Sequence, residues 1–108
     1  MDPLYVIVHQ EVIWDEQRRL LAEEKGLGRI PSILVELCRI RLFERYVEIE
    51  DNPSHIFYPL EEHILVCGGY GELCVAEHIL ALKQRGVLAH CYRPATLFSA
   101  DFGVKIDF

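Results

Sequence analysis

HILVCGGYGELCVAEHILALKQRG, residues 63–86, contains the pattern that decides the fold. A continuous apolar run leads through three glycines into apolar residues at helical spacing, which end at Gly86. This pattern predicts a buried strand, a tight turn and an amphipathic helix. A second strand is expected at residues 87–92, so residues 63–92 should form a βαβ unit with a right-handed crossover.

The preceding half of the chain supplies further elements of the same kind. Residues 4–9 are β-branched and continuously apolar, which predicts a central strand covered on both faces. Asp15 is a plausible N-cap for a surface helix over residues 16–25. Pro31 and Ser32 open a second helical pattern, and the alternation over residues 45–50 favours a half-exposed edge strand.

Strands that alternate with helices predict the fold class. We expect one α/β domain over residues 1–108, with three layers in a Rossmann-like arrangement. Its sheet should be mostly parallel, with about four to five strands. Pro94 is expected to end the strand that begins at residue 87, and residues 102–108 alternate like a last strand, on an edge or exchanged with a partner.

Composition narrows the classes of partner. The net charge of −6 repels phosphate backbones and anionic lipid surfaces, so neither nucleic acid nor a membrane is an expected partner. The start of the chain lacks the basic residues of a signal peptide, which predicts a cytoplasmic protein. A hydrophobic content of 51% is high for a small domain and indicates a homo-oligomer.

The cysteines are spaced without any CxxC pair. Cys38, Cys67, Cys74 and Cys91 lie in three expected elements, which favours reduced, mostly buried thiols over a disulfide framework or a zinc site. We therefore predict no metal and no cofactor.

A composite site is expected beyond the carboxyl ends of the parallel strands, where ligands bind in open α/β sheets. The amides of the glycine turn would meet a small anionic ligand, or a protein partner, at a helix N-terminus. The glycines also fit a second interpretation, in which they only permit a tight turn, and the Glu72 carboxylate itself could take the anionic role. The candidate ligand contacts are Gly68, Gly69, Tyr70, Gly71, Glu72 and Arg93.

Three families resemble this turn. Residues 69–74 look like the GxGxxG turn of dinucleotide-binding Rossmann domains, with Cys74 in the position of the third glycine. The CGGY of residues 67–70 resembles the nucleophile elbow of glutamine amidotransferases of the cobyric-acid-synthase type. Gly68, Cys74 and Gly86 are spaced as in isochorismatase-like cysteine hydrolases, although Val8 stands where that family has an aspartate.

The cysteine families imply an alternative to a binding module, namely a reduced cysteine-hydrolase-like enzyme. Cys74 or Cys67 would be its nucleophile, and the turn amides would form the oxyanion site. His9 at a strand end is the first candidate for the general base, because Glu11 could fix its tautomer. His78 is the second, because it lies four residues after Cys74 on one helical face.

Overall fold

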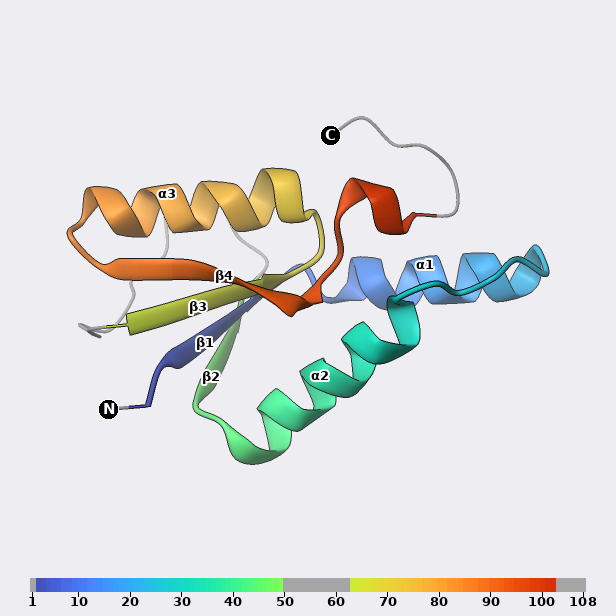
Figure 1. Ribbon diagram of the computed structural model, residues 1–108, viewed down its shortest axis with the longest axis horizontal. Helices are drawn as coiled ribbons and strands as arrows, with labels where there is room; N and C mark the ends of the chain where they lie inside the picture. The colour runs from blue at the N-terminus through green and yellow to red at the C-terminus, as the bar shows by residue number, and fades with distance from the viewer. Residues whose placement is uncertain (1, 50–62, 103–108) are drawn as a thin grey trace.

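The computed structural model describes residues 2–49 and 63–102, which form a small α/β domain built on a parallel sheet (Figure 1). The strand order is β2-β1-β3-β4. The predicted fold class is confirmed, and the sheet has four strands within the described residues. The strands are β1 (Leu4–Val8), β2 (Tyr46–Ile49), β3 (His63–Gly68) and β4 (Leu88–Thr96).

Helices cover both faces of the sheet. α1 (Glu11–Ala22) and α2 (Ile30–Phe43) lie on one side, and α3 (Ala76–Gln84) lies on the other (Figure 1). All five residues of β1 are buried because its side chains alternate between the two resulting cores. This confirms the prediction of a central strand.

The start of α1 differs from the prediction. Asp15 does not cap the helix, which begins at Glu11, directly after the loop that follows β1. Ile13, Glu16 and Leu20 are the buried residues of α1, at helical spacing that starts before Asp15. Packing against the sheet therefore decides where this helix begins, and a capping side chain does not.

The end of β4 also differs from the prediction, because the strand continues through Pro94 to Thr96. A proline is tolerated there since β4 is an edge strand among the described residues, where its N–H groups on the open side have no ladder partner. The register also shifts between Val66 and Gly68 of β3, which absorbs the irregular stretch. The strand predicted at residues 102–108 is not tested, because all but the first of these residues lie outside the described part of the chain.

α2 begins at Ile30 with Pro31 in its first turn, close to the predicted start, and β2 lies at an edge of the sheet formed by the described residues, as predicted. Among residues 2–49 and 63–102, no helix has the length and apolar character needed to cross a membrane.

The strand order creates a switch point. From β1 the chain proceeds through α1 and α2 to β2 on one side, whereas from β3 it proceeds through α3 to β4 on the other. The carboxyl ends of β1 and β3 are neighbours, so the connections that leave them diverge. A crevice outside such ends is the usual ligand position in open α/β sheets.

Candidate functional site

The glycine turn after β3 is a place of close backbone approach. A Cβ at Gly68, where φ is +123°, would lie 1.9 Å from the Val8 carbonyl oxygen. A Cβ at Gly69 would lie 2.6 Å from the His9 carbonyl oxygen. Only glycine permits the ends of β1 and β3 to lie this close together. These two glycines are therefore required by the fold, whatever the turn binds.

The turn amides have backbone partners inside the domain. The Gly69 N–H donates to the Val8 carbonyl at 2.8 Å, and the Gly71 N–H donates to the Leu97 carbonyl at 2.9 Å. A Cβ at Gly71 would lie 2.6 Å from the Phe98 ring, so an aromatic side chain packs against the turn. The expectation that the amides of Gly69 and Gly71 are uncovered is wrong, because the segment after β4 fills that space.

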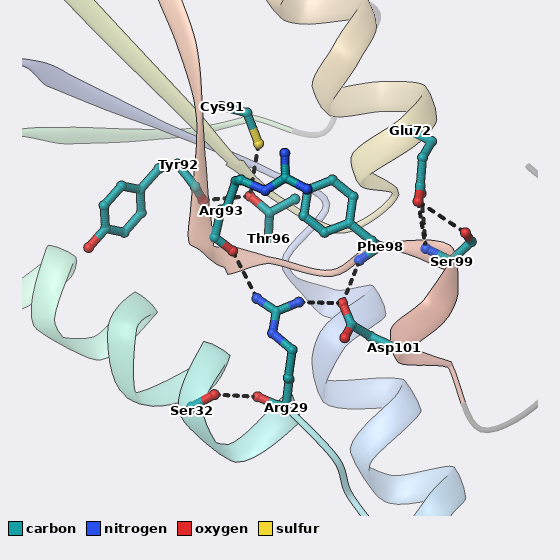
Figure 2. A network of polar contacts seen from close by, with 10 residues as sticks. All are labelled: Arg29, Ser32, Glu72, Cys91, Tyr92, Arg93, Thr96, Phe98, Ser99 and Asp101. Carbon is teal, nitrogen blue, oxygen red and sulfur yellow. Dashed lines mark hydrogen bonds and ion pairs between the residues drawn. The ribbon is translucent and has the colours of Figure 1, made fainter.

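Glu72 helps to hold this segment in place (Figure 2). Its carboxylate accepts hydrogen bonds from the backbone N–H and the hydroxyl of Ser99, at 2.9 and 3.0 Å for the shortest contacts. Glu72 lies in the π-helical turn η2 (Gly71–Val75), at the end where a carboxylate opposes the partial positive charge of the backbone. The Glu72 carboxylate therefore takes part in closing the turn through Ser99, and its hydrogen bonds do not go to the amides of Gly69 and Gly71.

Arg93 lies inside β4 and not beyond its end. Its guanidinium carbon is 4.9 Å from the centroid of the Phe98 ring, a cation–π geometry. Its carbonyl oxygen accepts a hydrogen bond from Arg29, whose guanidinium also pairs with Asp101 at 2.6 Å (Figure 2). Arg93 therefore belongs to the network that closes the turn, together with two residues that the sequence analysis did not single out.

The two candidate nucleophiles are not activated. Burial raises the pKa of the Cys67 thiol to about 12. Burial, reinforced by the Glu77 carboxylate, also raises the pKa of Cys74. A reactive cysteine needs a lowered pKa, so both directions weigh against nucleophilic catalysis.

The His78 imidazole is bonded to backbone. Its Nδ1–H donates to the carbonyl oxygen of Cys74 at 2.8 Å. Burial lowers the pKa of His78, so the neutral ring is favoured. His78 and Cys74 are therefore in contact, as their spacing predicted, but the contact is to the main chain of Cys74. The His78 Nδ1 that makes it is not available to accept a proton from the Cys74 thiol.

His9 lies at the switch point, where the structure brings it next to the glycine turn. Its Nδ1 is 3.2 Å from the Glu11 carboxylate, and its ring meets the Tyr70 ring edge-on, with 6.3 Å between centroids. His9 and Tyr70 have φ values of 47° and 56°, in the left-handed region that a bulky tyrosine rarely adopts. Such outliers cluster at ligand sites because the surrounding structure must hold them.

A hollow of about 210 Å³ opens between α1 and the ring of Tyr70. Four of its lining residues come from α1, and none of those four was a candidate site residue in the sequence analysis. The lining residues are Val12, Asp15, Glu16, Arg19, Tyr70 and Phe102. The Tyr70 and Phe102 rings are stacked within 14° of parallel, with 6.5 Å between centroids.

The polar lining of the hollow includes an ion pair between a buried glutamate and a partly exposed arginine. The Glu16 side chain is only 3% exposed and pairs with Arg19 one helical turn away. Within the described part of the chain, Glu16 Oε1 and Arg19 Nη2 are buried and have no hydrogen-bond partner beyond this ion pair. The sequence contained a signal for this pair, since a Glu at a core position of a helix is rare without a basic residue nearby.

No group of three or more His, Cys, Asp or Glu side chains able to hold a metal ion occurs within residues 2–49 and 63–102. Searches against models of known protein families, curated proteins and solved structures find no significant match to the chain. The functional argument therefore rests on the geometry of the site.

Proposed function

We propose that this domain is a binding module whose small-molecule ligand occupies the hollow between α1 and Tyr70. The observation that carries the proposal is the composition of the hollow, in which the Glu16–Arg19 ion pair lies beside the stacked rings of Tyr70 and Phe102. Ligand sites typically combine apolar and aromatic walls with a few placed polar groups, and this hollow has that composition.

The backbone around the hollow supports the same proposal. A non-glycine residue in the left-handed region costs about 1 kcal/mol or more, and a β-turn of ordinary conformation would avoid it. At Tyr70 this conformation accompanies a ring that forms one wall of the hollow. The strain has a rationale if the ring position matters for binding.

The lining predicts the chemistry of the ligand. Two aromatic rings and Val12 favour a flat apolar group, and a carboxylate beside a guanidinium favours an edge that both donates and accepts hydrogen bonds. Asp15 and Glu16 are balanced by Arg18 and Arg19, in a chain of net charge −6. The expectation of an anionic ligand therefore gives way to a neutral or cationic one, because the described lining residues include no unpaired cation.

The size of the hollow limits the ligand to about one ring, since drug-sized pockets begin at about 300 Å³. A set of three probes that share a ring and differ in charge tests the proposal: benzamide, benzamidine and benzoate. At about ten times a dissociation constant in the millimolar range, a ligand stabilises a protein by about 1.4 kcal/mol. For a domain of this size, that raises the Tm by about 5 °C.

We expect benzamide and benzamidine, at about 10 mM, to raise the Tm, and benzoate to have little effect. If benzoate alone raises the Tm, the ligand is expected to be anionic, as the sequence predicted. If none of the three changes the Tm, the proposed binding function is wrong.

The cellular location is a second part of this proposal. All four cysteines are free thiols, which fits a reducing compartment such as the cytoplasm. Localisation of a tagged full-length chain by microscopy and fractionation tests it, and recovery of the four thiols in oxidised form from cells would contradict it.

A further inference from the structure

Two histidines from neighbouring strands are in contact at the end of the sheet away from the glycine turn. His63 is the first residue of β3, and His90 lies near the start of β4. Their ring centroids are 5.5 Å apart, and the ring planes are nearly perpendicular, at 83°. The two residues are far apart in the sequence, so the prediction of no metal, which was based on the cysteines, did not take this pair into account.

The pairing of β3 with β4 places both rings on one face of the sheet. In the parallel ladder Leu65 lies opposite His90, and His63 is two residues before Leu65. Side chains two residues apart on a strand share a face, so the two histidines are diagonal neighbours. Leu65 packs against the core on the α1 and α2 side. The histidines therefore lie on this face, with His63 half-buried and His90 exposed.

One nitrogen of this pair has no hydrogen-bond partner within the described part of the chain. It is the Nε2 atom of His63, which is buried. A neutral imidazole has one N–H donor and one nitrogen with a free lone pair, and buried polar atoms are nearly always satisfied in folded proteins. A metal ion that accepts the lone pair would satisfy this atom. The neighbouring ring of His90 is reachable from solvent and supplies a second lone pair.

The separation of the two rings fits a shared metal ion. A histidine nitrogen lies about 2.0–2.1 Å from zinc, which puts the ring centroid about 3.2 Å from the ion. Two centroids 5.5 Å apart then subtend about 120° at the ion, near the tetrahedral angle of zinc sites. One ring has to turn so that both nitrogens face the ion. His90 can do so, because it is exposed and histidine χ2 is a broad torsion.

We infer that His63 and His90 form a binding site for a divalent transition-metal ion, of which Zn²⁺ is the expected one. Imidazole is a preferred ligand of Zn²⁺, whereas Mg²⁺ and Ca²⁺ prefer oxygen ligands. Within residues 2–49 and 63–102 no group of three or more metal-binding side chains occurs, so these two imidazoles hold the ion and water completes its coordination. The site is independent of the proposed ligand hollow, which lies beside the glycine turn.

The surroundings of the pair favour a cation. The net charge of −6 attracts positive ions to the chain as a whole. In the ladder between β3 and β4, the residues opposite the two histidines are Leu88 and Leu65, so neither imidazole has a cationic side chain opposite it there. Apolar neighbours also limit the access of water and lower the local dielectric constant, which strengthens the interaction of the ligands with an ion.

Calorimetric titration of the full chain with Zn²⁺ tests the inference. Two of the four ligands of a structural zinc site should give about half of its binding free energy, which corresponds to a dissociation constant on the order of 10 µM. We expect one Zn²⁺ per chain at this affinity and no binding of Mg²⁺ at the same concentrations. If Zn²⁺ does not bind at concentrations up to about 1 mM, the inference is wrong.

Substitution of each histidine identifies the ligands. His90→Ala and His63→Ala should each weaken Zn²⁺ binding at least tenfold. His90 is exposed, so its variant should fold, and it decides the matter alone if His63→Ala does not fold. His9→Asn is the matched control, because it removes an imidazole at the other end of the sheet, and asparagine tolerates the left-handed backbone of that position. Zn²⁺ binding that is unchanged in His90→Ala would overturn the site.

Co²⁺ in place of Zn²⁺ distinguishes imidazole ligands from the four free thiols of the chain. Thiolate ligands add intense ultraviolet charge-transfer absorption to a Co²⁺ site, whereas imidazole and water ligands give only weak visible bands. We expect weak visible bands that disappear in His90→Ala. Intense thiolate absorption that persists in His90→Ala would assign the metal to the cysteines and contradict the inference.

Discussion

The ends of the two central strands lie side by side, but the segments that leave them have different roles. After β3, the glycine turn is closed by the backbone of Val8 and Leu97, by the Phe98 ring and by the pairing of Glu72 with Ser99. After β1, the chain leaves a hollow with an ion pair and the Tyr70 ring on its walls. The glycine-rich side is therefore closed within the domain, and the side with ordinary residues is where we propose that a ligand binds.

The largest effect should come from adding a Cβ to the closed side. In Gly68→Ala, the new methyl group would lie 1.9 Å from the Val8 carbonyl oxygen, in a backbone conformation that alanine rarely adopts. We expect the free energy of unfolding to fall by at least about 3 kcal/mol in urea unfolding. Gly26→Ala is the control, since a Cβ there has nothing within 4 Å, and it should change stability by less than about 1 kcal/mol. If Gly68→Ala and Gly26→Ala have the same free energy of unfolding, Gly68 does not lie this close to the Val8 carbonyl.

The buried thiol at the end of β3 should make stability depend on alkaline pH. Its pKa is raised to about 12 in the folded chain, against about 9 for an ordinary thiol. Because the unfolded chain loses this proton first, the stabilisation is complete below about pH 9 and is lost as the pH rises towards 12.

The slope approaches about 1 kcal/mol per pH unit in that range. Comparing the free energy of unfolding of the wild type with that of Cys67→Ala at pH 8 and pH 10.5 isolates this contribution. A gap between the two proteins that does not change with pH would show that the Cys67 thiol ionises as easily in the folded chain as in the unfolded one.

Removing the carboxylate that closes the turn should have a moderate effect. Glu72→Ala deletes the hydrogen bonds from Ser99, which are exposed to solvent, so we expect a loss of about 1 kcal/mol in urea unfolding. The amides of Gly69 and Gly71 stay paired with carbonyls in this variant, so sulfate should not stabilise it more than it stabilises the wild type. If sulfate stabilises Glu72→Ala much more than the wild type, the glycine turn is an anion-binding site after all.

A substitution of Tyr70, in the wall of the hollow, should have the smallest effect on stability. Its effect on ligand binding should be the largest. Asparagine tolerates the left-handed conformation, so Tyr70→Asn should keep the free energy of unfolding within about 1 kcal/mol of the wild type. The stabilisation by benzamide should nevertheless vanish. Tyr46→Asn, a half-exposed tyrosine on β2, is the matched control and should retain it.

Periodicity was sufficient to predict the elements that bury apolar side chains. The central strand at residues 4–8, the turn into α3 and the start of α2 near Pro31 follow from local pattern. The start of α1 was predicted wrongly from Asp15, since burial of Ile13 decides it. The continuation of β4 through Pro94 depends on its edge position, which no local pattern contains.

The candidate site was predicted only in part. The sequence predicted that His9 and Tyr70 lie at the same edge of the sheet, and their ring centroids are 6.3 Å apart. It could not show that residues 97–99 fold back over the glycine turn, because that contact joins segments about 27 residues apart. For the same reason the Glu16–Arg19 pair appeared as part of a charged surface helix, although the Tyr70 and Phe102 rings complete a hollow around it.

Mapping of benzamide binding by backbone amide chemical shifts tests the central claim most directly. The hollow predicts that the amides of Val12, Arg19 and Tyr70 shift progressively with benzamide, while those of Gly69 and Gly71 respond only as neighbours of Tyr70. Shifts that centre on Gly69, Gly71 and Glu72, with α1 unaffected, would contradict the account and make the glycine turn the binding site.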